Sequence, residues 1–229
     1  MVNPILQQYI QLVDFLGYAL GPDYEIALHD LTDQNQSIIA IANNHISRRE
    51  VGAPMTNVGL KILRDKSYER ENYLLHYRGL SVHGKMLRSS TMFIKDGKVP
   101  VGMLCINFDD SRYRAISKKV IDLCHPNEFL ERFFPLHVAF AEETDAAVPA
   151  AEGFHNSVDA VAVDAVTREL QQRGVTVEQL TPEVRMEIIT ALEAGGIFLL
   201  KGAVNDVAEA LHCSRASMYR YIAQAKGED

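Results

Sequence analysis

The spacing of apolar residues predicts a helix first and then a set of strands. Between Pro4 and Leu20 apolar side chains recur at helical spacing, and Gly21-Pro22 ends the pattern. Two isoleucine-rich runs, Tyr24 to Leu31 and Ser37 to Asn43, predict strands, and the polar residues between them predict a hairpin loop. The pattern from His45 to Lys85 is mixed and predicts short helices.

Further along, the chain predicts a hairpin followed by a helix. Ser90 to Asp109 predicts two long strands, and the Asp96-Gly97 dipeptide between them is a strong hairpin signal. Ser111 to Leu123 has helical spacing, with Ser111 as the expected cap. Because helices and strands succeed each other in this way, we expect an α+β domain with an antiparallel sheet.

After this region the pattern becomes helical. Residues 142–156 are poor in large apolar side chains and rich in Ala and Glu, so we expect a linker there. The linker would join a first domain, residues 1–141, to a second domain, residues 157–229. In the second domain Val158 to Arg173 and Pro182 to Glu193 predict helices, and the pattern contains no convincing strand.

The stretch from Ala203 to Lys226 has the pattern of a helix-turn-helix, in which two short helices cross closely around a tight turn. Ala208 is small enough for the crossing, and Ser214 can cap the second helix. His212 occupies the turn position that Gly usually takes, and His tolerates the left-handed conformation. The residues expected to pack the two helices together are Val207, Leu211, Cys213, Met218, Tyr221 and Ile222.

Composition places the chain among soluble globular proteins. It has 229 residues, of which 47% are hydrophobic and 23% charged, and no apolar run approaches the roughly 20 residues that span a bilayer. The first residues lack the basic and apolar blocks of a signal peptide. The three cysteines form no C-x-x-C pair, so we expect a reduced, cytoplasmic protein that does not contact membranes.

The net charge of -7 argues mildly against nucleic acid as a partner, but the helix-turn-helix differs from the whole chain. From Lys201 to Lys226 four basic residues outnumber two acidic ones, and both acids lie on the first helix. We therefore expect the second helix to contact double-stranded DNA. The residues expected at that interface are Ser214, Arg215, Ala216, Ser217, Tyr219, Arg220 and Lys226. The alternative is an ordinary helical hairpin that serves only as a packing module.

Catalytic and metal-binding patterns are missing from the sequence. The glycine-rich phosphate loops GxGxxG and GxxxxGK[ST] are absent. Cys124 and His125 are adjacent, and neighbouring side chains usually point apart, which argues against a nucleophile with its base. His76 and His83 lack the spacing of a structural zinc site. We therefore expect no enzyme activity, no metal ion and no cofactor.

Several long segments carry a resemblance to a known family. In the C-terminal part it rests on RMEIITALEAGGIFLLKGAVNDVAEALHCSRASMYRYI (Arg185 to Ile222). In the N-terminal part it rests on LHDL (Leu28 to Leu31), NNHISRREVGAPMT (Asn43 to Thr56), LRSSTMFIKD (Leu87 to Asp96) and VGMLCINFD (Val101 to Asp109). By these segments the chain resembles the bacterial YheO-like regulators, which join a PAS-like domain to a C-terminal helix-turn-helix and include a regulator of D-arginine utilisation. The resemblance implies a transcriptional regulator.

The resemblance also implies a PAS-like pocket, enclosed by helices and a sheet, for a small polar ligand such as an amino acid or a carboxylate. Alternation along the strand after Val99 predicts that Val101, Met103, Cys105 and Asn107 share one face. The candidate ligand-binding residues are His29, Asp30, His45, Ser47, Arg48, Ser89, Ser90, Thr91, Cys105 and Asn107. Each has a structural alternative, because Ser and Thr are common in turns and a core histidine can be satisfied internally.

A mechanism follows from one sensor-like domain joined to one short DNA-reading unit. Two protomers would associate through the sensor domain, or through the helix from Val158 to Arg173, and place two helices in successive major grooves. A ligand that binds one arrangement better would shift the population toward or away from DNA binding. Asn44 and Ala53 stand where the family pattern has Gly and Asp, so the resemblance does not identify the ligand. The rival interpretation is a small-molecule-binding or protein-interaction module whose helical tail docks a protein partner.

Overall fold

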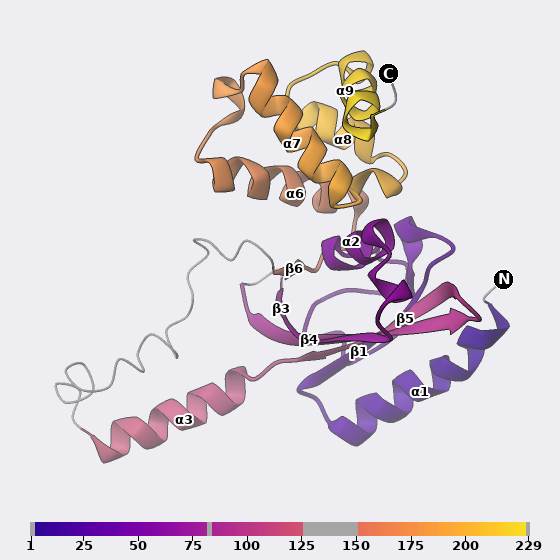
Figure 1. The fold of residues 1–229 in the computed structure, drawn as a ribbon. Coiled ribbons are helices and arrows are strands. Elements are labelled where there is room, and N and C mark those ends of the chain that lie inside the picture. The colour runs from indigo at the N-terminus through magenta and orange to yellow at the C-terminus, as the bar shows by residue number, and fades with distance from the viewer. Residues whose placement is uncertain (1–2, 82–83, 126–150, 228–229) are drawn as a thin grey trace.

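The computed structural model describes residues 3–81, 84–125 and 151–227, and Figure 1 shows their arrangement. In these ranges the strands are β1 (Tyr24–Asp30), β2 (Ile38–Ala42), β3 (Tyr73–Leu80), β4 (Met86–Asp96), β5 (Val99–Phe108) and β6 (Glu152–Gly153). The α-helices are α1 (Pro4–Leu20), α2 (Asn57–Asp65), α3 (Ser111–Cys124), α6 (Val158–Arg173), α7 (Pro182–Ala194), α8 (Ala203–Ala210) and α9 (Arg215–Lys226). Short 3-10 helices are η1 (Gln34–Gln36), η2 (Ser67–Glu69), η3 (Val177–Gln179) and η4 (Ile197–Leu199).

The strands form one curled sheet in the order β2-β1-β5-β4-β3-β6. Neighbouring strands are antiparallel except β3 and β6, which run parallel, so the sheet is mixed rather than purely antiparallel. The hairpin predicted at Asp96-Gly97 is confirmed, because Asp96 pairs with Val99 and Gly97 has a φ of 60°. A two-residue hairpin turn needs such a left-handed residue. The α+β class expected from the sequence is therefore correct.

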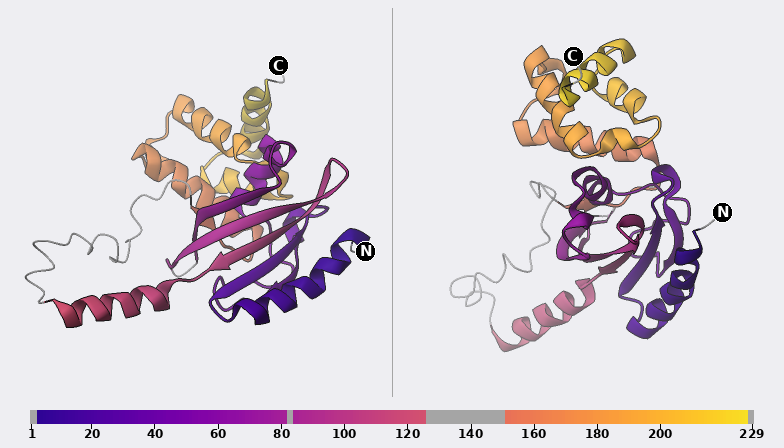
Figure 2. Two further views of the ribbon diagram at one scale, coloured as in Figure 1. Left: turned by 60° about the horizontal axis from the view of Figure 1, so that its bottom comes forward. Right: turned by 45° about the vertical axis from the view of Figure 1, so that its right-hand side comes forward.

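Helix α1 covers one face of this sheet (Figure 2). Its first turn is capped by Asn3, whose side chain accepts a hydrogen bond from the backbone N–H of Ile5 at 2.9 Å. Leu6 and Val13 are buried against apolar side chains of β1 and β5. A Cβ at Gly17 would lie 2.5 Å from the Cβ of Ala42, so the absence of a side chain lets α1 approach β2 closely.

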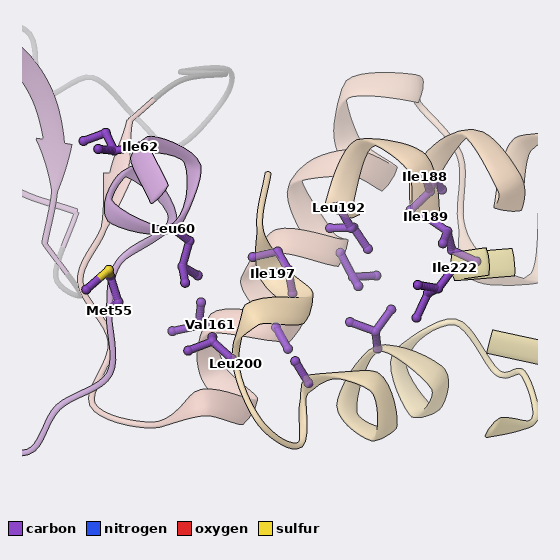
Figure 3. Packing of buried hydrophobic residues seen from close by; sticks show 14 of the residues in the cluster. Met55, Leu60, Ile62, Val161, Ile188, Ile189, Leu192, Ile197, Leu200 and Ile222 are labelled. Carbon is purple, nitrogen blue, oxygen red and sulfur yellow. The ribbon is translucent and has the colours of Figure 1, made fainter. Parts of the chain in front are cut away.

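The opposite face of the sheet is covered by α2 and, beyond it, by the C-terminal helices (Figure 1). One cluster of buried side chains runs from the sheet through α2 into the helical domain. Leu60 of α2 belongs to this cluster together with Val161 of α6 and Leu200, as Figure 3 shows. Arg64 of α2 adds a polar contact, donating from Nη2 to Oε1 of Glu193 at 2.6 Å. The two parts of the chain therefore share a core.

The helices predicted in the second domain are confirmed with small changes at their ends. Thr181 caps α7, since its hydroxyl accepts a hydrogen bond from the backbone N–H of Val184 at 3.3 Å. Gly196, with a φ of 78°, follows the end of α7. Within the described ranges no helix is long and apolar enough to cross a membrane.

Two strands differ from the sequence-based expectation. The stretch predicted as short helices contains α2 but also β3, where a bulge between Leu74 and Tyr77 and a left-handed His76 (φ 55°) interrupt the alternation of side chains. The expected linker, residues 142–156, contributes β6, whose two residues pair with Gly79 and Leu80. Residues 142–150 lie outside the described ranges. A strand this short carries no periodic signal.

Two local predictions were wrong for identifiable reasons. Val101 does not share a face with Met103, because Ile94 pairs with Gly102 and Lys95 with Pro100, which leaves Val101 as an extra residue in a bulge. Val101 packs on the α1 side of the sheet instead. At the start of α3 the cap is Asp110 rather than Ser111, which is the first helical residue.

Candidate nucleic-acid interface and internal cavity

Helices α8 and α9 pack as a helix-turn-helix. Val207, Leu211 and Met218 are fully buried, and Ile222 is nearly so, as predicted. Ala208 is also buried, and its small side chain allows the two helices to approach closely. Because α9 also packs against α7, its position is fixed by two neighbouring helices.

The turn between the two helices fixes where α9 begins. His212 has a φ of 49°, which confirms the left-handed conformation expected there. Ser214 is the N-cap, and its hydroxyl accepts a hydrogen bond from the backbone N–H of Ser217 at 3.2 Å. Cys213 is half-buried rather than fully buried, and this burial raises the pKa of its thiol. The thiol is therefore held in its protonated, unreactive form at neutral pH.

The outward face of α9 is polar and cationic. The helix carries three basic residues and no acidic one. The Arg220 guanidinium lies 5.5 Å from the centre of the Tyr221 ring, a contact that supports its side chain. The exposed members of the predicted interface are Ser214, Arg215, Ala216, Tyr219, Arg220 and Lys226, while Ser217 is half-buried. The major groove admits an α-helix, and in α9 two small residues, Ala216 and Ser217, lie between Arg215 and Arg220.

A second feature of the molecule is a small cavity between α2 and the sheet. Its volume is about 10 Å³, which is room for about one water molecule. The sheet contributes His29, Tyr77, Thr91, Met103, Cys105 and Glu152 to its walls. The segment that covers the sheet contributes Met55, Thr56, Val58, Gly59 and Ile62.

A buried polar network lies on the same side of the sheet as this cavity. Glu25 of β1 is fully buried, and its carboxylate accepts hydrogen bonds from Nδ2 of Asn107 at 2.9 Å and from the backbone N–H of Ser47 at 3.1 Å. The Ser89 hydroxyl donates to Oδ1 of Asn107 at 2.8 Å. Buried polar groups are costly without partners, so this network fixes the three strands that carry it.

Arg49 is almost completely buried at the edge of the network, where its Nη2 donates to the carbonyl of Pro54. Burial lowers the pKa of Arg49, whereas the charges of Glu152 and Glu25 raise it. Its guanidinium lies 6.0 Å from the centre of the Phe154 ring, and its Nε has no acceptor among the described residues. A buried cation with spare hydrogen-bonding capacity is unusual in a purely structural role.

Glu152 of β6 projects a second carboxylate into the same region. Its Oε1 accepts a hydrogen bond from the Thr56 hydroxyl at 2.6 Å. In the part of the chain that the structure describes, no donor with good geometry reaches Oε2. Burial raises the pKa of Glu152, while the Thr56 bond, the charge of Arg49 and hydrogen bonds with Tyr77 and Ser89 lower it. The charges of two buried carboxylates, Glu25 and Glu152, thus act on the buried guanidinium of Arg49.

The remaining titratable groups on the cavity wall are neutral at pH 7. Burial, and secondarily the charge of Arg49, holds the pKa of His29 well below its usual value, and its Nδ1 lies 2.9 Å from the Ser37 hydroxyl. Burial raises the pKa of Tyr77 well above its usual value. Burial, followed by the charge of Glu152, raises the pKa of the Cys105 thiol to about 12. The wall therefore offers neutral donors and acceptors beside the charged cluster.

The structure separates the predicted ligand-binding residues into two groups. On the cavity side of the sheet it brings together His29, Ser47, Ser89, Thr91, Cys105 and Asn107. The others lie apart from them. Asp30 accepts a hydrogen bond from the backbone N–H of Thr32 at 2.9 Å and holds a turn. His45 and Arg48 are exposed, and Ser90 accepts a hydrogen bond from the backbone N–H of His76 outside the cavity.

The charged residues beside the cavity, Glu25, Arg49 and Glu152, were not predicted from the sequence. Glu25 alternates with Ala27 and His29 on β1, so the same alternation rule would have placed it beside His29. Arg49 and Arg48 are adjacent, and only the left-handed backbone at Arg48 (φ 63°) decides which of them is buried. Glu152 lies in the expected linker, where the sequence carries no signal for a strand.

Helix α2 lies between the cavity and the C-terminal helices. Val58, Gly59 and Ile62 line the cavity. Leu60 and Arg64 contact the helical domain. In addition, Asn35 and Lys201 exchange two hydrogen bonds, of 2.8 and 2.9 Å. Among the described residues no group of three or more His, Cys, Asp or Glu side chains is arranged to hold a metal ion.

Comparison with known proteins agrees with this architecture. Residues 1–125 match the YheO-like PAS domain family, and residues 161–223 match an HTH (helix-turn-helix) domain family. The chain is 30% identical to the protein YheO of Escherichia coli (strain K12) over 233 residues, which cover 98% of this chain and 86% of YheO. It is 27% identical to the transcriptional regulator DauR of Pseudomonas aeruginosa over 226 residues, which cover 98% of this chain and 96% of DauR.

Proposed function

Because the chain belongs to the family of transcriptional regulators that combine a YheO-like PAS domain with an HTH domain, we propose that it binds DNA and is controlled by a small ligand. The family is one of regulators and not a class of enzymes. The observation that carries the proposal is the exposed cationic face of α9, supported by a buried helix-turn-helix core. The proposed location is the cytoplasm, since the partner is chromosomal DNA.

In the proposed complex α9 enters the major groove of double-stranded DNA. Arg215 and Arg220 are the groups able to bind guanine or phosphate, and Ala216 leaves room for the base edges. The side chains proposed to bind phosphate are Ser214, Ser217, Tyr219 and Lys226. Two copies act together, because one helix in one groove contacts only a few base pairs.

The proposed ligand is a small polar molecule, such as an amino acid, that enters the cavity below α2. Two buried charges support this proposal: Glu152 lines the cavity, and Arg49 lies beside it with an Nε that has no acceptor among the described residues. Thr91, Cys105 and His29 supply neutral partners on the wall.

Coupling between the ligand and the DNA-binding helix would run through α2. The cavity has room for about one water molecule, so a larger ligand has to displace α2 from the sheet. The far side of α2 packs against the helical domain through Leu60 and Arg64. A displacement of α2 would therefore change how the two copies of α9 are presented to DNA, which is a population shift between two arrangements.

The DNA-binding part of the proposal is tested by fluorescence anisotropy with duplexes from the protein's own promoter region, across a series of salt concentrations. We expect the Arg215→Ala/Arg220→Ala variant to bind at least about tenfold more weakly and with a salt slope smaller by about 2. Arg70→Ala, an exposed arginine outside the helical domain, is the matched control. Binding that does not depend on salt, or that is as tight in the Arg215→Ala/Arg220→Ala variant as in the control, would contradict the proposal.

The ligand part is tested by thermal unfolding in the presence of amino acids and related carboxylates. A compound at about a hundred times its Kd stabilises the folded state by about 2.7 kcal/mol. We expect Thr91→Val to reduce the shift, because the Thr91 hydroxyl lies on the cavity wall. Ser90→Ala, at the next position of β4 and outside the cavity, should retain the shift. Equal effects of the two variants would count against this cavity as the binding site.

A further inference from the structure

Helix α3 presents an apolar stripe to solvent. Tyr113, Ile116, Val120 and Leu123 are 51%, 62%, 54% and 87% exposed. No residue of α3 is buried, and Figures 1 and 2 show the helix extending away from the other described elements. Large apolar side chains in a contiguous exposed row mark an interaction surface more often than scattered ones do.

The spacing of this stripe is that of a coiled-coil seam. The four residues, Tyr113, Ile116, Val120 and Leu123, follow one another at intervals of three, four and three, which are the a and d positions of a heptad. The ion pairs of α3 lie outside the stripe, with Lys118 bound to Asp122 at 2.8 Å. The stripe itself carries no charge, so a second identical stripe can pack against it without burying an ion.

The base of α3 is held firmly to the sheet. Arg112 donates to the carboxylate of Asp23 at 2.8 Å, and the Tyr113 ring lies 5.6 Å from the ring of Phe108, the last residue of β5. Asp109 accepts a hydrogen bond from the backbone N–H of Ser111 at 2.9 Å. An anchored helix loses little further freedom on association, which favours its use as a contact.

We propose that α3 is the dimerisation helix and that its stripe pairs with the same stripe of a second copy in a parallel coiled coil. The inference rests on the proposed function, which requires two copies on DNA, and adds the surface that joins them. Charge decides the direction of the pair. With the same residues in an antiparallel register, the two Lys119 side chains would face each other, whereas in a parallel pair Lys119 faces Cys124 of the partner.

The size of the stripe sets the expected strength of the dimer. It supplies four side chains from each copy, whereas a standard stable interface uses about 20–30 residues a side. The α3 seam alone therefore gives a weak, concentration-dependent dimer. Parallel pairing places the sheets of both copies at the same end of the coil.

The first test is the molecular mass of the full chain by analytical ultracentrifugation across micromolar concentrations. We expect Ile116→Glu to raise the dimer dissociation constant at least about tenfold. Phe15→Glu, at an apolar residue of α1 that is 64% exposed, is the matched control and should leave the constant unchanged. Since Ile116 is exposed, the variant protomer should keep the melting temperature of the monomeric fold.

The second test is mild oxidation of Ile116→Cys in a Cys124→Ser background. A d-position cysteine in a parallel coil meets its own copy within disulfide distance, so we expect covalent dimers. Ala115→Cys, one residue away and off the stripe, should not cross-link. Equal cross-linking of both variants, a dimer unaffected by Ile116→Glu, or a monomer at every concentration would overturn the inference. A dimer that Ile116→Glu does not affect, or a protein that stays monomeric, would mean that another segment of the chain or an anionic membrane covers the stripe. DNA binding by α9 is measured separately, so a failure of this inference can be told apart from a failure of the proposed function.

Discussion

His29 shows how burial changes the chemistry of a single residue. The residue is 4% exposed and lines the cavity, and burial holds its pKa well below 6.5. As the pH falls below 6.5, the unfolded chain takes up a proton on this histidine while the folded chain does not. The contribution of His29 to the free energy of unfolding is therefore fully present above pH 6.5 and decreases as the pH falls below it.

The corresponding prediction concerns His29→Gln. Wild-type stability should decrease on acidification below pH 6.5 by up to about 1.4 kcal/mol per pH unit from this residue. The variant should lack this part of the slope in urea unfolding curves recorded from pH 7.5 to about 5.5. His45→Gln, at an exposed histidine, serves as the control. A variant slope equal to that of the wild type would show that His29 does not carry the effect.

For single residues, the sequence predicted the chemical type of a side chain better than the place where it lies in the fold. Periodicity placed Val207, Leu211 and Met218 in the core of the helix-turn-helix correctly, because a helix pair this short has only one apolar face to bury. It could not choose between Arg48 and Arg49, since their side chains are equivalent in sequence and differ only in backbone conformation. Buried polar residues such as Glu25 are fixed by partners on other strands, which a linear pattern does not record.

Strand β6 is the shortest strand among the described residues, and hydrogen bonds of Asn57 and Asn156 hold the chain around it. Asn57 holds it from α2, donating from Nδ2 to the carbonyl of Ala151 at 3.1 Å and accepting from the backbone N–H of Gly153 at 2.8 Å. Asn156, three residues later, donates to the carbonyl of Arg48 at 2.8 Å. Since α6 begins at Val158, this short segment joins the cavity wall directly to the helical domain.

We expect Asn57→Ala to release β6 without unfolding the sheet. The loss of two hydrogen bonds, each worth about 1 kcal/mol net, should speed hydrogen exchange at Gly153 by at least about tenfold. Asn72→Ala, at an exposed asparagine before β3, should leave that exchange unchanged. If exchange at Gly153 does not respond to Asn57→Ala, the strand is held by other contacts.

At the element scale the sequence identified helices and hairpins more readily than short strands. The β4–β5 hairpin was predictable because Asp-Gly fixes its turn and both strands are long. Strand β3 was not, because its first residues are largely exposed on both sides and a bulge interrupts its pattern. Two-residue β6 depends entirely on the groove left between β3 and α2, which exists only after folding.

The whole molecule is organised around α2. On one side it covers the cavity, and on the other it contacts the helical domain that carries α9 (Figures 1 and 3). The order of the two domains along the chain could be predicted from composition and motifs. Their shared core did not, because it joins Leu60 to residues more than 100 positions away, and no local pattern predicts such contacts.

Two copies of α9 are proposed to read the major groove of DNA. Dimethyl sulfate footprinting of the protein's own promoter, in growing cells where any natural ligand is present, tests this proposal. Dimethyl sulfate modifies guanine N7 in the major groove, the atom that Arg215 and Arg220 are proposed to cover. We predict two protected clusters about 10 base pairs apart, and their loss in the Arg215→Ala/Arg220→Ala strain. A promoter with no protected guanine, or protection unchanged in the variant strain, would show that α9 does not read the major groove in this way.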